Sequence, residues 1–192
     1  MSRTFLAIGL TGIGLQFAAT AQAADQGDVN GLLTVDGPRH ELRGGVMYHD
    51  AMNRESGVDL NAEYLSRFAA FQFTIPGVNM RTALRPHFGG SLNTAGDTSF
   101  VYGGYSLTID VTKRFFIEGS FGGMAHNGVH VSSDGSRLSL GCNVMFREAA
   151  SLGFRITDHW NVSAMIEHGS NAGKCEANNG ITNAGIRLGY AF

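Results

Sequence analysis

The chain has 192 residues and a formal net charge of -2, so its bulk electrostatics exclude a protein built to bind nucleic acid. The length allows one domain of ordinary size. Glycine is plentiful at 27 residues, proline is scarce at 3, and the mean hydropathy is -0.02. These values fit a soluble protein, and they equally fit a membrane barrel whose strands alternate apolar and polar residues.

The first residues have the three parts of a secretory signal peptide. Arg3 supplies a positive charge, residues 5–19 are mostly apolar, and Ala21-Gln22-Ala23 is a small-x-small cleavage site. The apolar run is shorter than the roughly 20 residues that a transmembrane helix needs. We therefore predict a cleaved signal peptide over residues 1–23, export into the periplasm, and a single mature domain over 24–192.

Eight segments show the period-two alternation of strands, and no long segment has a helical period. In Trp160–Ile166, for example, apolar residues alternate with Asn161, Ser163 and other polar or adaptable residues. The predicted strands, in chain order, cover residues 42–49, 58–64, 82–93, 101–111, 115–125, 140–155, 160–170 and 184–192. An even number of antiparallel strands is typical of bacterial outer-membrane barrels, and we predict an all-β, eight-stranded antiparallel transmembrane barrel.

The connections between these strands favour one orientation. Residues 112–114 and 157–159 form short links, as periplasmic turns do, and residues 127–137 and 171–179 form longer links, as extracellular loops do. The link over residues 68–78 is longer than this orientation predicts.

A soluble eight-stranded barrel of the lipocalin kind would produce similar alternation, with its apolar face inward. The chain ends in Phe192, with Tyr190, Leu188 and Ile186 on the same strand face, which resembles the assembly signal of outer-membrane barrels. Trp160 and Tyr190 also fall where a periplasmic-side aromatic girdle would lie. These features favour the membrane barrel.

The polar faces of the strands carry charges of both signs, which would pair inside a barrel too narrow for a channel. By strand parity Glu167 faces the lumen, and an ion pair with Arg187 is the expected arrangement. Cys142 and Cys175 both fall near the outer rim of an exported protein, where a disulfide is the ordinary outcome. His126 and His130 lack a third ligand, so no metal site is predicted.

The strand over residues 160–170 brings two chemically active side chains to its outward face. His168 and Ser170 continue the outward series that begins at Trp160. From Trp160 to His168 is about 26 Å along the strand. A tilt near 45° makes this about 19 Å of height, against an apolar band of about 25 Å. The pair therefore lies where acyl chains meet headgroups, and an imidazole beside a hydroxyl is what acyl transfer needs.

The sequence around this pair resembles the lipid A 3-O-deacylase family of the PagL type, whose members are also described as acyloxyacyl hydrolases. The resemblance rests on Glu167-His168-Gly169-Ser170-Asn171-Ala172-Gly173 and on Asn178-Asn179-Gly180-Ile181. Weaker matches lie in residues 85–90 and 93–98. The resemblance implies an eight-stranded outer-membrane barrel that hydrolyses the ester linking an acyl chain to position 3 of lipid A.

The resemblance also implies roles for individual residues. Ser170 would be the nucleophile, His168 the general base, and Asn178, with the backbone amides after Ser170, would lie near the oxyanion. Asn171 would help shape the turn, since asparagine is common where a strand meets a loop.

Position 182 departs from the family pattern. The best-known members have a glutamate twelve residues after the serine, where it orients the histidine, and this chain has Thr182. Strand parity keeps Thr182 on the outward face, but a hydroxyl cannot compensate an imidazolium charge. Loss of the triad acid costs on the order of 10⁴ in rate in a serine hydrolase. Glu176, in the last loop, is a possible substitute acid.

The sequence thus gives one leading hypothesis and two alternatives. The first is an outer-membrane esterase that acts on lipid A or lipopolysaccharide in the outer leaflet and needs no cofactor. The second is a non-enzymatic barrel that serves a structural or surface-binding role, and the third is an esterase or phospholipase for another lipid. A monomer and a homodimer both fit.

Overall fold

The computed structural model describes residues 33–34, 37–51, 54–78 and 80–192. The predicted signal peptide and the predicted domain boundary at residue 24 lie outside the described residues. None of the described residues belongs to a helix that is long and apolar enough to cross a membrane.

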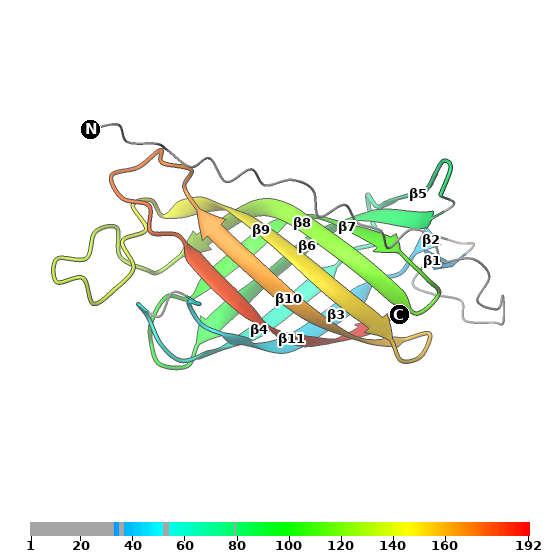
Figure 1. Ribbon diagram of the computed structural model, residues 1–192, viewed down its shortest axis with the longest axis horizontal. Coiled ribbons are helices and arrows are strands. Elements are labelled where there is room, and N and C mark those ends of the chain that lie inside the picture. Colours follow the sequence, from blue (N-terminus) through cyan, green and yellow to red (C-terminus); the bar gives the residue numbers. More distant parts are fainter. Residues whose placement is uncertain (1–32, 35–36, 52–53, 79) are drawn as a thin grey trace, which may run out of the picture.

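Eight long antiparallel strands close into a barrel, which confirms the predicted fold class (Figure 1). They are β3 (Glu41–Tyr48), β4 (Val58–Leu65), β6 (Met80–Asn93), β7 (Phe100–Asp110), β8 (Phe115–His126), β9 (Val144–Arg155), β10 (Trp160–Ser170) and β11 (Ile181–Ala191). Each of these eight strands pairs with the next one along the chain, so that β4 pairs directly with β6, and β11 closes the barrel by pairing with β3. The closed ladder leaves these strands without a free edge.

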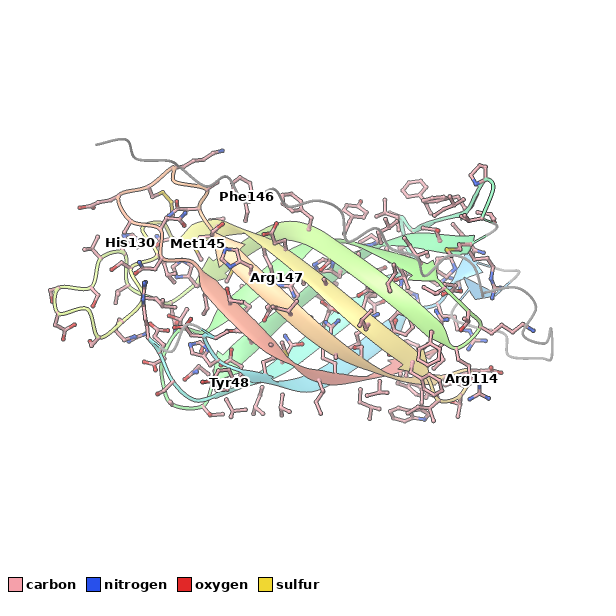
Figure 2. The ribbon with its side chains drawn as sticks, viewed as in Figure 1. Tyr48, Arg114, His130, Met145, Phe146 and Arg147 are labelled. Atoms are coloured by element: carbon pink, nitrogen blue, oxygen red, sulfur yellow. A yellow bond between two sulfur atoms is a disulfide. The ribbon has the colours of Figure 1, made fainter. Side chains whose placement is uncertain are left out.

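One end of the barrel carries long loops and the other carries short turns. The long loops span residues 49–57, 94–99, 127–143 and 171–180, and the two tight turns at the opposite end span 111–114 and 156–159. This asymmetry matches the extracellular loops and periplasmic turns of bacterial barrels. Tyr48 and Arg114 mark the two ends in Figure 2.

The long link over residues 68–78 is explained by an extra strand, β5 (Phe71–Ile75), which sequence analysis did not predict. β5 pairs with the first part of β6, from Phe71 opposite Leu84 to Ile75 opposite Met80. Because Leu65 pairs with His87 on the same strand, β5 continues the line of β4 after an interruption of five residues. Figure 1 shows this hairpin beside the short-turn end of the barrel. Phe71 and Phe73 on β5 are exposed, as is Phe68 just before it. A two-stranded ladder of β1 (Leu33–Thr34) and β2 (Gly37–Pro38) lies nearby.

The barrel is apolar outside and polar inside, as the transmembrane prediction requires and the opposite of a soluble lipocalin-type barrel. Neighbouring residues on β9 show this alternation in Figure 2: Phe146 is on the outer surface and Arg147 is buried in the interior. The outer wall presents a band of exposed apolar side chains, among them Leu42, Val46, Leu60, Phe88, Val101, Ile117, Phe121, Leu152, Val162, Ile166, Ile186 and Leu188.

Buried ion pairs fill the lumen. Arg43 bonds Glu41 at 2.8 Å and Glu63 at 3.1 Å, and it also pairs with Glu118. Arg85 bonds Glu41 at 2.8 Å. Since a buried charge without a partner is costly, this mutual pairing is what allows a charged core.

The predicted ion pair between Glu167 and Arg187 is wrong. Glu167 instead binds Arg147, with a distance of 2.7 Å to Nη2, and Arg187 binds Glu63 at 2.8 Å. Strand parity correctly placed these groups inside the barrel, but it gave no information on partners across the lumen, which depend on strand stagger.

The predicted strand over residues 140–155 begins later than expected, at Val144. Leu138 and Leu140 leave the wall and pack at the long-loop end of the barrel beside Phe100, Met124 and Ile181. Gly141 has a φ of 75°, which turns the chain between this apolar cap and β9.

Candidate functional site

The ladder between β10 and β11 places His168 directly opposite Thr182. His168 Nδ1 lies 2.8 Å from the Thr182 hydroxyl oxygen, a hydrogen-bonding distance. Ser170 is two residues further along β10, so it shares the outward face with His168, and all three side chains are partly exposed. The structure therefore places the three residues that the sequence proposed as a catalytic group on one outward face, with His168 in contact with Thr182.

The imidazole of His168 is held by its surroundings as well as by Thr182. Gly180 lies against the ring: a Cβ at this position would be 2.8 Å from His168 Cε1 and 3.2 Å from Nε2. Gly180 also has a φ of 68°, which favours glycine. When the Nδ1 proton is donated to Thr182, Nε2 has a free lone pair and can accept a proton.

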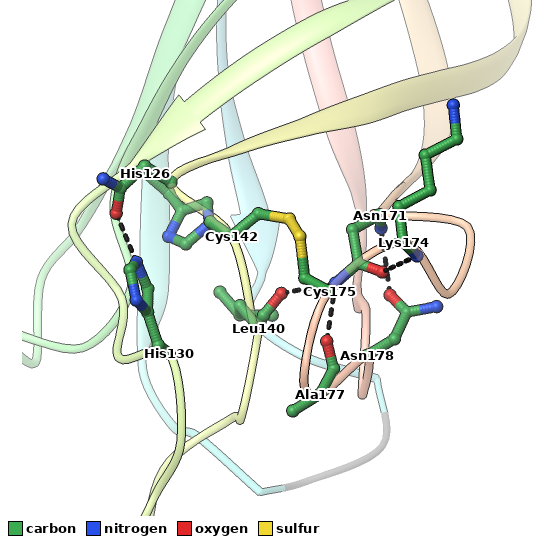
Figure 3. The surroundings of a disulfide bond; sticks show 10 residues. His126, His130, Leu140, Cys142, Asn171, Lys174, Cys175, Ala177 and Asn178 are labelled. Carbon is green, nitrogen blue, oxygen red and sulfur yellow. Dashed lines mark hydrogen bonds between the residues drawn. A yellow bond between two sulfur atoms is a disulfide. The ribbon is translucent and has the colours of Figure 1, made fainter.

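Asn171 is the structural centre of the loop after Ser170. Its side-chain amide donates to the carbonyl oxygens of Leu140 and Ala177, at 2.8 Å and 2.6 Å, and its Oδ1 accepts from the backbone N–H of Lys174. Figure 3 shows this set of contacts. With both ends of its amide engaged, the Asn171 side chain shapes the turn.

Asn178 contacts the same turn. Its Oδ1 accepts the backbone N–H of Asn171 at 2.9 Å, so the first amide after Ser170 is already occupied. The Asn178 side chain is exposed, which leaves its Nδ2 group available as a donor. Ala172 and Gly173 follow with φ values of 52° and 72°, and neither amide donates a hydrogen bond to the described chain.

A disulfide joins Cys142, just before β9, to Cys175 in the 171–180 loop, with a Cα–Cα distance of 5.9 Å (Figure 3). The loop is therefore anchored on the side of β9 as well as by its own strand ends. Glu176, the proposed substitute acid, is the next residue, and its side chain is exposed. The described partner of His168 Nδ1 is Thr182, not Glu176.

Sequence reasoning missed a carboxylate on the other side of His168. Glu148 on β9 is the cross-strand partner of His168, and its side chain is exposed on the outer wall. The parity of β9 alone would have shown an acid on the outward face. Its position beside His168 depends on the β9–β10 register, which the turn at residues 156–159 sets.

An apolar groove of about 360 Å³ opens on the outer wall next to Ser170. Phe146, which pairs with Ser170, lies on it together with Phe121 and Val144. Lys174 also lines the groove, and its Nζ lies 5.0 Å from the centre of the Phe146 ring. The groove is thus suited to an alkyl chain and has a cation at the level of the rim.

His126 and His130 make protein contacts. His126 Nε2 bonds the carbonyl of Cys142 and His130 Nε2 bonds Asn143. No group of three or more potential metal ligands occurs within the residues that the structure describes.

Comparison with known proteins places the chain in a family. The family model described as lipid A 3-O-deacylase (PagL) matches residues 65–191. The chain belongs to the PagL family. The match covers β6 to β11 and thus includes His168, Ser170 and Thr182, so the family resemblance inferred from the sequence is confirmed.

Two solved structures are similar to this chain to different degrees. The crystal structure of the outer membrane enzyme PagL has a TM-score of 0.62 at 16% identity, over 79% of this chain and 99% of that chain. The N-terminal β-barrel domain of Pseudomonas aeruginosa OprF has a TM-score of 0.49 at 13% identity, over 80% and 96% of the two chains. The first likeness supports the PagL-type barrel fold, while the second is too distant to support an argument. No curated protein matches the sequence.

Proposed function

We propose that this PagL-family barrel is an outer-membrane deacylase that hydrolyses the 3-O-linked acyl ester of lipid A. The observation that carries the proposal is the placement of His168 and Ser170 on the outer wall, at the long-loop end of the barrel. A nucleophile in that place faces the outer leaflet, where lipopolysaccharide resides. The family match adds the acyl ester at position 3 as the substrate bond.

The reaction would proceed by covalent catalysis. Ser170 attacks the acyl carbonyl while His168 Nε2 takes the hydroxyl proton, and the same proton then passes to the departing sugar oxygen. Water, activated by His168 in turn, hydrolyses the acyl–serine ester and releases the fatty acid. The proposed steps use only the serine hydroxyl, the imidazole and water, so they call for no cofactor.

The oxyanion would be stabilised by donors in the 171–180 loop. The backbone N–H of Asn171 already donates to Asn178 Oδ1. The remaining donors are Asn178 Nδ2 and the backbone N–H groups of Ala172 and Gly173. Removing one such donor costs about 2.7–4 kcal/mol in well-studied hydrolases. Asn171 would act indirectly, by holding the turn that presents these groups.

Thr182 would replace one of the two functions of the family's glutamate. Its hydroxyl oxygen can accept a hydrogen bond from His168 Nδ1–H, with 2.8 Å between nitrogen and oxygen, and so fix the imidazole tautomer. It carries no charge and therefore cannot compensate the imidazolium that forms when Ser170 is deprotonated.

The groove beside Ser170 supports a substrate with an acyl chain and an anionic headgroup. The chain would lie on Phe121 and Phe146, and Lys174 would meet a phosphate of the headgroup. The exposed apolar wall keeps the barrel in the membrane with the substrate, and the predicted signal peptide would deliver it there.

Mass spectrometry of lipid A from cells expressing the protein tests the proposal. We expect wild-type cells to lose one 3-hydroxyacyl chain from lipid A and Ser170→Ala cells to keep it. Thr182→Glu should match or exceed the wild type, since it restores the family's acid at an unchanged outward position. Intact lipid A in all three strains, with each barrel folded in the outer membrane, would overturn the proposal.

A non-enzymatic barrel is the second candidate, and the absence of a carboxylate at position 182 favours it. Such a protein would leave lipid A intact as wild type and become a deacylase only as Thr182→Glu. That single result would assign this chain to the non-catalytic class while confirming that the site geometry is retained.

A further inference from the structure

Glu148 is an exception among the acidic residues of the barrel wall. Within the described residues of the eight barrel strands, the other six carboxylates are all buried in the lumen: Glu41, Asp59, Glu63, Asp110, Glu118 and Glu167. Glu148 alone lies exposed on the outer wall. A carboxylate on the lipid-facing side of a barrel is unfavourable, and an ionisable residue in such a place commonly has a function.

The position of Glu148 relates it directly to His168. The β9–β10 register places the two residues opposite each other, while the β10–β11 register places Thr182 opposite His168 on the other side. Side chains of such cross-strand pairs have Cβ atoms about 4.5–5.5 Å apart. Thr182, His168 and Glu148 therefore form one row across three strands on the outward face.

The surroundings of Glu148 leave its charge available. Within the described chain it makes no ion pair, and its cross-strand partner on β8 is Phe121. Two charged groups lie in the 171–180 loop, and both are exposed: Lys174, over the Phe146 ring, and Glu176. The apolar wall and the lipid around Glu148 reduce screening, which strengthens its interaction with a charge that forms on His168.

We propose that Glu148 is a positioning residue that stabilises the His168 imidazolium, supplying the charge that Thr182 lacks. The inference rests on the proposed function. When the proton of Ser170 Oγ passes to His168 Nε2 and the Oγ–acyl carbon bond forms, the imidazole becomes positive and the acyl oxygen negative. Thr182 holds Nδ1 and Glu148 compensates the positive charge, until the proton leaves with the sugar hydroxyl as the ester bond breaks.

The two functions that the family's glutamate performs alone are thus divided between two strands. A hydroxyl on β11 orients the ring and a carboxylate on β9 compensates its charge. It follows that the carboxylate can be supplied from either neighbouring strand, because positions 148 and 182 each lie directly opposite His168 on the outward face. This equivalence distinguishes an electrostatic role for Glu148 from a role in folding.

The test measures how fast Ser170 is labelled by a long-chain alkyl fluorophosphonate, a probe that reports nucleophile activation without requiring lipid A as the substrate. The purified full-length barrel is used, as wild type, Glu148→Gln, Glu148→Asp and the double variant Glu148→Gln/Thr182→Glu. Ser170→Ala defines the background. Asp158→Asn, at the opposite end of the barrel, controls for the loss of one negative charge.

We expect Glu148→Gln to slow labelling on the order of tenfold or more, less than the loss of about 10⁴ on removing a directly bonded triad acid. Glu148→Gln should lower the maximal rate of labelling and leave the affinity for the probe unchanged. Glu148→Asp should retain most of the rate, Asp158→Asn should match the wild type, and the double variant should recover what Glu148→Gln lost.

Two results would overturn the inference: labelling of Glu148→Gln at the wild-type rate, or a loss that Thr182→Glu does not restore although the barrel is folded. A wild-type protein whose Ser170 is never labelled would overturn the inference and the catalytic proposal together. Rapid, Glu148-dependent labelling with intact cellular lipid A would support the inference and reject only lipid A as the substrate.

Discussion

At the scale of single residues, the His168–Thr182 contact shows what a neutral partner can do for a catalytic base. The hydroxyl fixes the ring through one hydrogen bond of 2.8 Å. The family resemblance pointed to position 182, and strand parity then placed Thr182 on the same outward face as His168. The sequence was not sufficient to find Glu148 beside His168, because the register between β9 and β10 does not follow from the sequence of either strand alone.

Gly180 gives a prediction about the positioning of His168. Gly180→Ala places a Cβ 2.8 Å from His168 Cε1, so the ring must shift from the position in which it contacts Thr182. We expect Ser170 labelling or lipid A hydrolysis to fall by about tenfold or more, since small displacements of a catalytic group are costly.

Gly135→Ala is the matched control. Gly135 has a similar φ of 73°, but an added Cβ there meets nothing within 4 Å. Both variants carry the strain of a positive φ, so Gly135→Ala controls for that strain without a contact to the ring, and only Gly180→Ala should lose activity. Equal activity in the two variants would show that Gly180 does not hold the ring.

At the scale of elements, the last loop is organised by bonds that cross to a neighbouring strand. Asn171 contacts Leu140, and Cys175 is bonded to Cys142. The two half-cystines are 33 residues apart in sequence. In a chain-entropy model, a bond that closes a loop of this length stabilises the folded state by about 3–4 kcal/mol. The cysteine content predicted a bond near the rim, but the buried contacts of Asn171 required the structure.

Removal of the disulfide should loosen the site without opening the barrel. For Cys142→Ser/Cys175→Ser we expect faster hydrogen exchange in residues 171–180, unchanged exchange in β10, and activity reduced several-fold. Reductant should reproduce the effect in the wild type and have no effect on the double variant. Two reactive thiols in the native protein, or unchanged exchange in the loop, would contradict this account.

At the scale of the whole molecule, the sequence predicted eight strands and their alternation, because the period-two pattern is local to each strand. The closed barrel was predicted from the even number of strands and from the family resemblance. The β4–β5 interruption and the pairing inside the lumen were not predictable in this way. Ser66–Ala70 does not alternate, and the choice of Arg147 for Glu167 depends on which strands the barrel stagger brings together.

A buried cluster closes the outer end of the barrel and links three of its loops. Glu55 accepts hydrogen bonds from Arg137 Nε and from the amides of Leu138 and Thr98. His49, the residue after β3, lies between Glu55 and Asp59, at 3.2 Å and 2.9 Å. Loops from three separate hairpins thus meet on one carboxylate.

This cluster predicts a pH dependence. Burial disfavours charge on His49, but the hydrogen bonds and charges of Asp59 and Glu55 outweigh it and raise the pKa of His49 from 6.5 to about 9. A raised pKa contributes stability that is fully present below about pH 6.5 and is lost as the pH rises through about 9. Burial likewise disfavours charge on Glu55, but hydrogen bonds from His49 and Arg137 hold its pKa well below its usual range.

The free energy of unfolding by urea, measured in lipid vesicles across pH 6 to 10, checks this prediction. The wild type should lose more stability over that range than His49→Gln, whose neutral side chain does not titrate. Identical pH dependence in the two proteins would show that the cluster does not link the loops through a charged histidine.

The central claim is that this barrel removes the 3-O-linked acyl chain of lipid A by way of Ser170. Its most direct test is the release of free 3-hydroxy fatty acid from purified lipid A by the purified, folded barrel, measured beside Ser170→Ala. The account predicts release of one chain per lipid A by the wild type and none by the variant. Equal release by both, or no release by a folded wild type, would contradict it.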